Sequence, residues 1–517
     1  MKTAVMLALL MLPVAGLESQ ELGTVHFPTT AGPEAQAHFL RGLALLHSFE
    51  YDRAAREFRQ AQRIEPGFAM AYWGEALTYT HPIWNQQDRD AARAVLGRLG
   101  DTRAARLSRA ADARERAYLE AVEILYGDGP KARRDTLYAS AMERIVREYP
   151  DDQEAKALYA LALLGLGQGV RDVPTYMRAA AIAQEVFEAN PNHPGAAHYI
   201  IHAFDDPVHA PLGLKAARAY SAIAPDAPHA QHMTSHIFVA MGMWDDVVRA
   251  NEQATAVTAR LAGRSRVGCG HYNEWLAYGY AQQGRYRDAA RLVMECVEEV
   301  ESGRRNPVSL GMMKARYLID TGDWSGTVAA ARVDTAQVTP PVRFALDLAA
   351  GLEAAAAGES VEARRALSRM EQRLQRSPGG ERGNLEVMTL VLRAAVLHAE
   401  GRSEEALETA ERAARLEADL PYEFGPPATY KPPRELRGEL LLSSGRAEEA
   451  AKEFRRALER TPGRTQALLG LARAASRAGE VETAAAAYAQ LAEIWKAADS
   501  ALGALREEAL GFARRRP

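Results

Sequence analysis

Small and apolar side chains recur in a fixed pattern along most of the chain, and residues 35–68 show it most clearly. Its six characteristic positions are occupied by Gly42, Leu45, Ala54, Phe58, Ala61 and Pro66. The small residues let two helices approach closely, and the larger apolar residues fill the space between them. The proline ends the second helix, because it has no amide hydrogen and clashes with the preceding turn. The pattern therefore predicts an antiparallel pair of helices.

The same pattern returns with a period of 34 residues, clearly at residues 431–464 and 465–498 and more loosely in between. A helix–turn–helix repeat of this length resembles the tetratricopeptide repeat family, and the resemblance covers most of residues 35–498. It implies an all-α fold: a tetratricopeptide-repeat solenoid, in which antiparallel helix pairs stack into a right-handed superhelix. It also implies that the first helix of each pair lines the concave face, where proteins of this family bind peptides.

Breaks in the pattern divide the chain into six parts. They are a signal peptide (1–17), an N-terminal repeat region with inserted helices (35–192), histidine-rich central repeats (193–303), diverged repeats (304–420), a proline-rich loop (421–433), and C-terminal repeats with an end helix (434–517). The loop contains five prolines and a glycine, so we expect it to be extended rather than helical.

The N-terminus has the pattern of a secretory signal, with Lys2 before an apolar run from about Val5 to Val14 and small residues at Ala15 and Gly16. An uncleaved anchor is the alternative. No later segment has 18 uncharged apolar residues, so we expect no membrane span in the mature chain. The sequence predicts a periplasmic or secreted protein.

The net charge and the cysteine content bear on nucleic-acid binding and on disulfide formation. The formal net charge is −4, so the chain lacks the basic surface of a nucleic-acid-binding protein. Repeat phasing puts Cys269 and Cys296 at neighbouring ends of two antiparallel helices. An oxidising compartment would permit a disulfide between them, and two buried free thiols are the alternative.

Histidine is concentrated in the central repeats. Seven of the thirteen histidines lie between residues 193 and 236, namely His193, His198, His202, His209, His229, His232 and His236. Two pairs among them have a spacing of four residues, which places both side chains on one helix face, and the pairs are 34 residues apart. The positions 42 residues after His229, His232 and His236 are occupied by His271, Glu274 and Tyr278. Three successive first helices are therefore predicted to present these side chains on the same side.

This arrangement favours a metal site on the concave face. A histidine pair one helical turn apart can share an ion, and a ligand from a neighbouring helix would complete the site. The predicted metal ligands are His198, His202, His232 and His236, followed by His229, His271, Glu274 and Asp205. Several imidazoles with a carboxylate suit zinc, copper, nickel or iron.

A histidine in a helix-packed interior can also be a core residue whose ring is hydrogen-bonded to its neighbours. This interpretation is favoured for His38, His193 and His209. Both interpretations stay open for His47 and His81.

Three functions fit these observations. The first is an exported scaffold that binds a transition metal, a protein or peptide partner in its concave groove, or both. The second is a metal-free protein–protein interaction scaffold. The third is a metalloenzyme with Glu274 or Asp205 as general base. No HExxH, GxSxG or GxxxxGK motif is present, so we favour the binding functions over an enzyme.

The residues at the groove positions differ from those with which related repeat domains bind a peptide. Related repeat domains hold a terminal carboxylate with lysine, arginine and asparagine, whereas the central repeats carry histidine, glutamate and tyrosine at those positions. The segments HPIW, HYIIHAFDDP, APHAQHMTSHIF and GHYNEWLAYGY resemble a group of bacterial exported tetratricopeptide proteins. That resemblance implies no particular activity.

Overall fold

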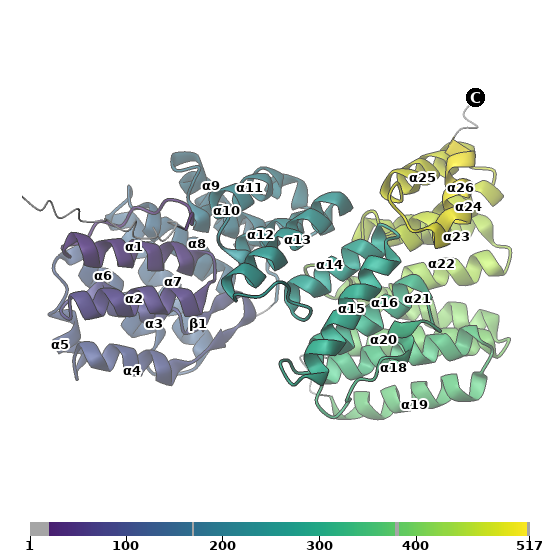
Figure 1. Ribbon diagram of the computed structural model, residues 1–517, viewed down its shortest axis with the longest axis horizontal. Coiled ribbons are helices and arrows are strands. Elements are labelled where there is room, and N and C mark those ends of the chain that lie inside the picture. The colour runs from purple at the N-terminus through teal and green to yellow at the C-terminus, as the bar shows by residue number, and fades with distance from the viewer. Residues whose placement is uncertain (1–19, 168–169, 378–381, 514–517) are drawn as a thin grey trace, which may run out of the picture.

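The computed structural model describes residues 20–167, 170–377 and 382–513, so the signal peptide predicted at residues 1–17 lies outside the described residues. Within them the chain forms 26 α-helices and one small hairpin of two-residue strands. Consecutive helices pack as antiparallel pairs, and the pairs stack side by side along the molecule (Figure 1). The predicted all-α solenoid of helix pairs is confirmed.

The first nine helices form the N-terminal part. They are α1 (Pro33–His47), α2 (Tyr51–Ile64), α3 (Ala69–Leu77), α4 (Arg89–Leu99), α5 (Arg103–Leu107), α6 (Ala113–Leu125), α7 (Lys131–Glu148), α8 (Gln153–Gly165) and α9 (Val173–Ala189). After α3 the strand β1 (Thr80–His81) pairs with β2 (Gln86–Gln87) in antiparallel register, around the 3-10 turn η1 (Pro82–Trp84). Proline begins this turn and Asn85 closes it in the left-handed region, which asparagine tolerates.

Six helices form the central part. They are α10 (Pro194–Ala203), α11 (Ala210–Ile223), α12 (Pro228–Ala240), α13 (Trp244–Leu261), α14 (His271–Gln282) and α15 (Tyr286–Glu301). Both α10 and α12 begin with proline, whose fixed φ suits the first helical position and whose missing amide hydrogen is not needed there. These two helices are buried along their whole length, so their histidines lie in the interior.

The remaining helices form the C-terminal part. They are α16 (Val308–Thr321), α17 (Thr327–Ala330), α18 (Pro340–Ala356), α19 (Ser360–Arg376), α20 (Arg382–Ala399), α21 (Ser403–Asp419), α22 (Pro433–Ser443), α23 (Ala447–Arg460), α24 (Thr465–Arg477), α25 (Val481–Ile494), the 3-10 turn η3 (Ser500–Leu502) and α26 (Gly503–Ala513). Residues 420–432, between α21 and α22, form a loop without helix. This loop contains most of the predicted proline-rich segment.

The small residues of the repeat pattern have the predicted role in helix packing. A side-chain carbon added at Gly42 would lie 2.8 Å from the ring of Phe58, which is itself fully buried. In the C-terminal repeats, Gly438 has the same relation to Phe454, also at 2.8 Å. Two helices can therefore approach across the aromatic ring only where the pattern has glycine.

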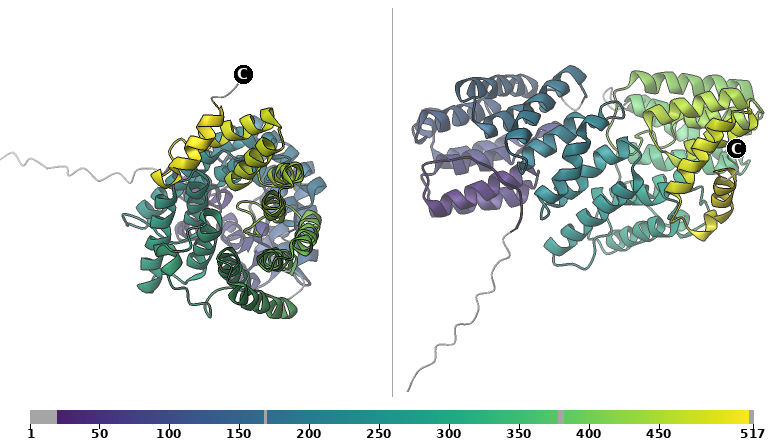
Figure 2. Two further views of the ribbon diagram at one scale, coloured as in Figure 1. Left: turned by 90° about the vertical axis from the view of Figure 1, so that its right-hand side faces the viewer. Right: turned by 90° about the horizontal axis from the view of Figure 1, so that it is seen from above.

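The C-terminal repeats fold back onto the central repeats, so that the yellow and teal helices adjoin (Figure 2). The indole nitrogen of Trp244 donates to the carbonyl of Gly463 at 2.8 Å, and that of Trp495 donates to the carbonyl of Gln282 at 3.1 Å. Gly242 has a φ of +68°, and a side chain there would lie 2.6 Å from the carbonyl oxygen of Pro462. The close contact therefore requires glycine on the central side.

The structure also decides between the two predicted states of the cysteines. Cys269 and Cys296 form a disulfide, with their Cα atoms 4.6 Å apart. The bond joins the start of α14 to the antiparallel helix α15, as expected for neighbouring ends of a hairpin. Within the described residues, no helix is long and apolar enough to cross a membrane.

Candidate metal centre

Three helices bring six histidines together, five of them in the interior. Helix α10 carries His198 and His202, α12 carries His229, His232 and His236, and α14 begins with His271. The six side chains divide into two groups of three, and in each group one nitrogen per ring lies within 4.8 Å of the others. We call His198, His202 and His229 the first triad, and His232, His236 and His271 the second triad.

The first triad has three buried nitrogen atoms without a hydrogen-bond partner. They are the Nε2 atoms of His198, His202 and His229. The Nδ1 of His198 donates to the backbone carbonyl of His47 at 2.7 Å, so its Nε2 carries the lone pair. A buried polar atom without a partner costs about 1–3 kcal/mol. A cation bound among these three rings would provide the missing partners.

The second triad has two lone pairs that face each other. Asn251 donates its amide to the carbonyl of Val247, so its Oδ1 accepts from Nδ1 of His232 at 2.7 Å. The carboxylate of Asp205 accepts from Nδ1 of His236 at 2.5 Å. Both rings therefore lack a proton on Nε2 in their neutral forms, and these two Nε2 atoms are only 3.2 Å apart.

That separation matches the spacing of metal ligands. Two nitrogens bound to tetrahedral zinc at about 2.0–2.1 Å are about 3.3 Å apart. The oxygen atoms of Asn251 and Asp205 fix the orientation of the two rings, as the partners of metal-binding histidines commonly do. His271, the third member, is about half exposed at the start of its helix.

The two triads adjoin. The ring centroids of His202 and His236 are 5.9 Å apart, and those of His229 and His232 are 6.0 Å apart. Aromatic side chains flank the cluster: Phe49 lies 4.2 Å from the ring of His198, and Phe49 itself has a left-handed φ of 54°. A backbone held in this sparsely populated region fits a position constrained by its surroundings.

Burial favours the uncharged form of four of these histidines. Desolvation lowers the pKa of His198, His202, His229 and His232 well below the usual value, and repulsion from neighbouring imidazoles lowers it further. Neutral imidazole is the form that binds metal ions. The site is therefore prepared for a cation at neutral pH.

Two predicted ligands, Glu274 and Asp205, do not join either triad. The carboxylate of Glu274 lies 4.0 Å from Nδ1 of His271, and burial raises the pKa of Glu274. Asp205 instead lies behind His236 and orients its ring. The six predicted histidines do lie together. His229, however, groups with His198 and His202 of α10 rather than with the other two histidines of its own helix, α12.

A third cluster was not anticipated as a unit. His47 and His193 both donate through Nε2 to the carboxylate of Glu154, at 2.7 and 3.2 Å. The hydroxyl of Tyr199 donates to the other nitrogen of His47, and the amide of Ala196 donates to that of His193. Every ring nitrogen therefore has a protein partner, so this cluster is a hydrogen-bonded core element, as predicted for His193.

Removing Glu154 is expected to destabilise the fold without affecting metal binding. Burial raises the pKa of this carboxyl, but the charges and hydrogen bonds of His193 and His47 outweigh it and hold the pKa well below the usual range. Glu154→Ala leaves two buried donors unpaired and should lower the free energy of unfolding by about 3–5 kcal/mol. Urea denaturation measures this change, with Glu185→Ala in an exposed ion pair as the matched control. A parallel fall in metal content would contradict the assignment.

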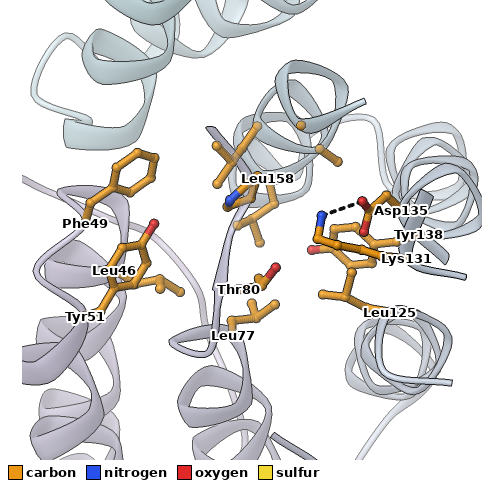
Figure 3. A pocket seen from close by; sticks show the side chains of 14 residues that line it. Leu46, Phe49, Tyr51, Leu77, Thr80, Leu125, Lys131, Asp135, Tyr138 and Leu158 are labelled. Carbon is orange, nitrogen blue, oxygen red and sulfur yellow. Dashed lines mark hydrogen bonds and ion pairs between the residues drawn. The ribbon is translucent and has the colours of Figure 1, made fainter. Parts of the chain in front are cut away.

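Phe49 also lines a small cavity in the N-terminal part (Figure 3). Its walls are largely apolar, and the ion pair of Lys131 and Asp135, at 2.7 Å, lies on the side opposite Phe49 (Figure 3). The cavity measures about 40 Å³. Since a water molecule requires about 10–15 Å³ on this measure, the cavity can hold a few waters but no organic substrate.

The groove positions of the C-terminal repeats are occupied by internal ion pairs. Lys431 contacts Glu435 at 2.8 Å and Glu439 at 2.6 Å. Glu435 also contacts Arg464 at 2.7 Å, and Arg464 is completely buried. These charges therefore pair with one another within the protein, although the Glu439 side chain is 42% exposed.

Comparison with known proteins supports the repeat assignment in part of the chain. Residues 441–507 match the tetratricopeptide repeat family. No curated protein matches the chain. Repeats of this type stack into extended concave surfaces that bind protein partners.

Several solved structures are similar over most of the chain. Yeast Tom70 has 12% identity and a TM-score of 0.28, covering 93% of this chain and 95% of its own. The human IFIT1 dimer with m7Gppp-AAAA has 15% identity and a TM-score of 0.33, covering 95% and 90%. Cut9 in the APC/C hetero-tetramer Cut9-Hcn1 has 11% identity and a TM-score of 0.33, covering 92% and 76%. At these identities and TM-scores, the likenesses carry no argument about function.

Proposed function

We propose that this protein is an exported repeat scaffold that binds transition-metal ions, one in each histidine triad. The observation that carries the proposal is the set of converging ring nitrogens. Three Nε2 atoms of the first triad are buried without a partner, and two of the second triad face each other at 3.2 Å. By contrast, every ring nitrogen of the nearby Glu154 cluster is hydrogen-bonded to a carboxylate, a hydroxyl or a backbone amide.

The donor set narrows the choice of metal. Each triad offers three imidazole nitrogens and no carboxylate or thiolate, a set that suits zinc, copper, nickel or iron and disfavours magnesium and calcium. Three protein ligands leave a further coordination position, as in catalytic rather than structural zinc sites. A metal in such a site supplies a Lewis acid.

Export and partner binding form the other parts of the proposal. Export is supported by the signal pattern at residues 1–17 and by the disulfide between Cys269 and Cys296, since such bonds persist in oxidising compartments. A protein or peptide partner is supported by the match of residues 441–507 to a repeat family. A metal-free interaction scaffold is the competing function.

Metal content tests the proposal. Protein prepared without a polyhistidine tag is offered zinc, copper, nickel or iron(II), desalted and measured by elemental analysis. We expect two ions per chain for at least one metal. His198→Ala and His236→Ala should each lose one ion, because each removes a nitrogen from a different triad.

His38→Ala is the matched control, since His38 is partly exposed and pairs with Glu57 away from both triads. This variant should keep both ions. No uptake of any of the four metals would contradict the proposal. Equal content in the wild type and both triad variants would do so as well.

A further inference from the structure

A cleft of about 490 Å³ adjoins the first triad. Its walls come from all three parts of the solenoid. Ile83 and Tyr176 belong to the N-terminal part, His202 to the central part, and Leu385 and Met388 to α20 in the C-terminal part. The volume is within the range of pockets that hold small organic molecules. It is also more than ten times that of the cavity beside Phe49.

The lining of the cleft is largely aromatic and apolar. Tyr176, Tyr422, Phe424 and Tyr430 contribute aromatic side chains. Such walls favour a flat ring, which can stack or pack edge to face against them.

Two unpaired polar atoms belong to residues of the same wall. Nε2 of His202 is buried without a hydrogen-bond partner. Oδ1 of Asp205 is also buried and unpartnered, because the interaction with His236 uses only Oδ2. Both residues are less than 5% exposed. The wall of the cleft thus includes two residues that each have a buried polar atom without a hydrogen-bond partner.

The charges at the cleft favour a neutral ligand. Arg171 is neutralised by Asp206 at 2.6 Å and also donates to the carbonyl of Ala203 at 2.6 Å. Burial raises the pKa of Glu423, although the Asn384 amide and the charge of Arg460 act in the opposite direction. No free cation remains among the cleft-lining residues to attract an anionic group, and an additional carboxylate would lie near Asp205.

The proline-rich loop forms one side of the cleft. Gly425 has a φ of +89°, and a side-chain carbon there would lie 2.3 Å from the ring of Trp275. The neighbouring Phe424 ring lies 5.6 Å from the ring of His236. Arg316 donates to the carbonyl of Pro427 at 2.7 Å, which anchors the far end of the loop. The loop is therefore docked over the histidine cluster.

We infer that this cleft binds a neutral phenol-type molecule beside the first triad. The aromatic ring lies among the aromatic and apolar side chains, and the hydroxyl donates to Oδ1 of Asp205. The hydroxyl then lies next to the metal-binding nitrogen of His202. The inference rests on the proposed function for the role of the metal, but the contacts with the ring and with Asp205 belong to the protein alone.

Calorimetric titration with 4-methylphenol tests the inference, using protein loaded with zinc and protein treated with a chelator. We expect saturable binding with one molecule per chain and a Kd below about 1 mM. 4-Methylanisole has the same ring without the hydroxyl hydrogen, so it should bind at least about tenfold more weakly. Phe424→Ala should weaken 4-methylphenol binding about five- to tenfold, because it removes an aromatic contact.

Val481→Ala is the matched control, since Val481 is exposed on α25 outside the cleft. It should bind 4-methylphenol as the wild type does. Phe424 is itself 43% exposed, so its replacement should leave the fold intact, which circular dichroism checks.

The outcomes separate the two proposals. Zinc uptake without binding of 4-methylphenol would overturn the cleft inference and leave the metal proposal standing. Binding of 4-methylphenol by protein that takes up none of the four metals would overturn the metal proposal and support the cleft. Equal affinity for 4-methylanisole, or an unchanged Kd in Phe424→Ala, would overturn the assignment of the ligand class.

Discussion

Zinc is expected to raise the free energy of unfolding by about 4 kcal/mol for each triad when the free ion is at about 1,000 times its Kd. The reason is linkage: the triads exist only in the folded chain, where α10, α12 and α14 bring histidines from three repeats together. The two sites together should therefore contribute about 8 kcal/mol. Chemical denaturation with and without zinc measures the difference.

Single substitutions should each remove the contribution of one triad to this stabilisation. His202→Ala should remove the part due to the first triad, and His236→Ala the part due to the second. The His38→Ala variant should retain the whole effect, because that side chain pairs with Glu57 outside the cluster. A zinc effect of the same size in all variants would show that the ion binds elsewhere.

The metal-free protein is expected to lose stability steeply as the pH falls below about 6.5, the usual pKa of histidine. Burial lowers the pKa of His198, His202, His229 and His232 in the folded state. Between the two pKa values the unfolded chain binds protons that the folded chain does not, so stability decreases as the pH decreases. Above about pH 6.5 both states are neutral and the full stability is present.

The expected slope is large because four buried rings contribute together. Each adds up to about 1.4 kcal/mol per pH unit in the range where only the unfolded form is protonated. Urea denaturation in the presence of a chelator, from pH 7.5 to 5, measures the slope. Replacing both His198 and His232 by glutamine should make it clearly shallower. A stability independent of pH over this range would contradict the neutral, buried state of the cluster.

Much of the fold could be predicted because the repeat pattern is local. Gly42 and Phe58 lie within one helix pair, so their contact follows from spacing alone. The same holds for the histidine pairs, since two residues four apart share a helix face. The period of the repeats then placed His198 and His232 on neighbouring helices.

The grouping into two triads could not be predicted in this way. His229 lies with His198 and His202 because of the offset between α10 and α12, which depends on how the two helices pack. The supporting contacts are more distant in sequence, such as the carbonyl of His47 that holds His198 across 151 residues. No spacing within the sequence encodes that contact.

The positions of three further residues also required the structure. Asn251 supports His232 from the second helix of the pair, whereas the prediction considered only first helices. Glu154 joins two histidines from different repeats. The loop after α21 was expected to be extended, but its docking through Gly425 onto Trp275 depends on the way the solenoid closes.

Anomalous diffraction from crystals of the metal-loaded protein tests the central claim most directly. We predict two peaks, one in each triad. Each should lie about 2.0–2.1 Å from a ring nitrogen of its three histidines. Ordered histidine rings without an anomalous peak in either triad would contradict the account. A peak confined to the His47, Glu154 and His193 cluster would do so too, because those nitrogens are assigned to protein partners.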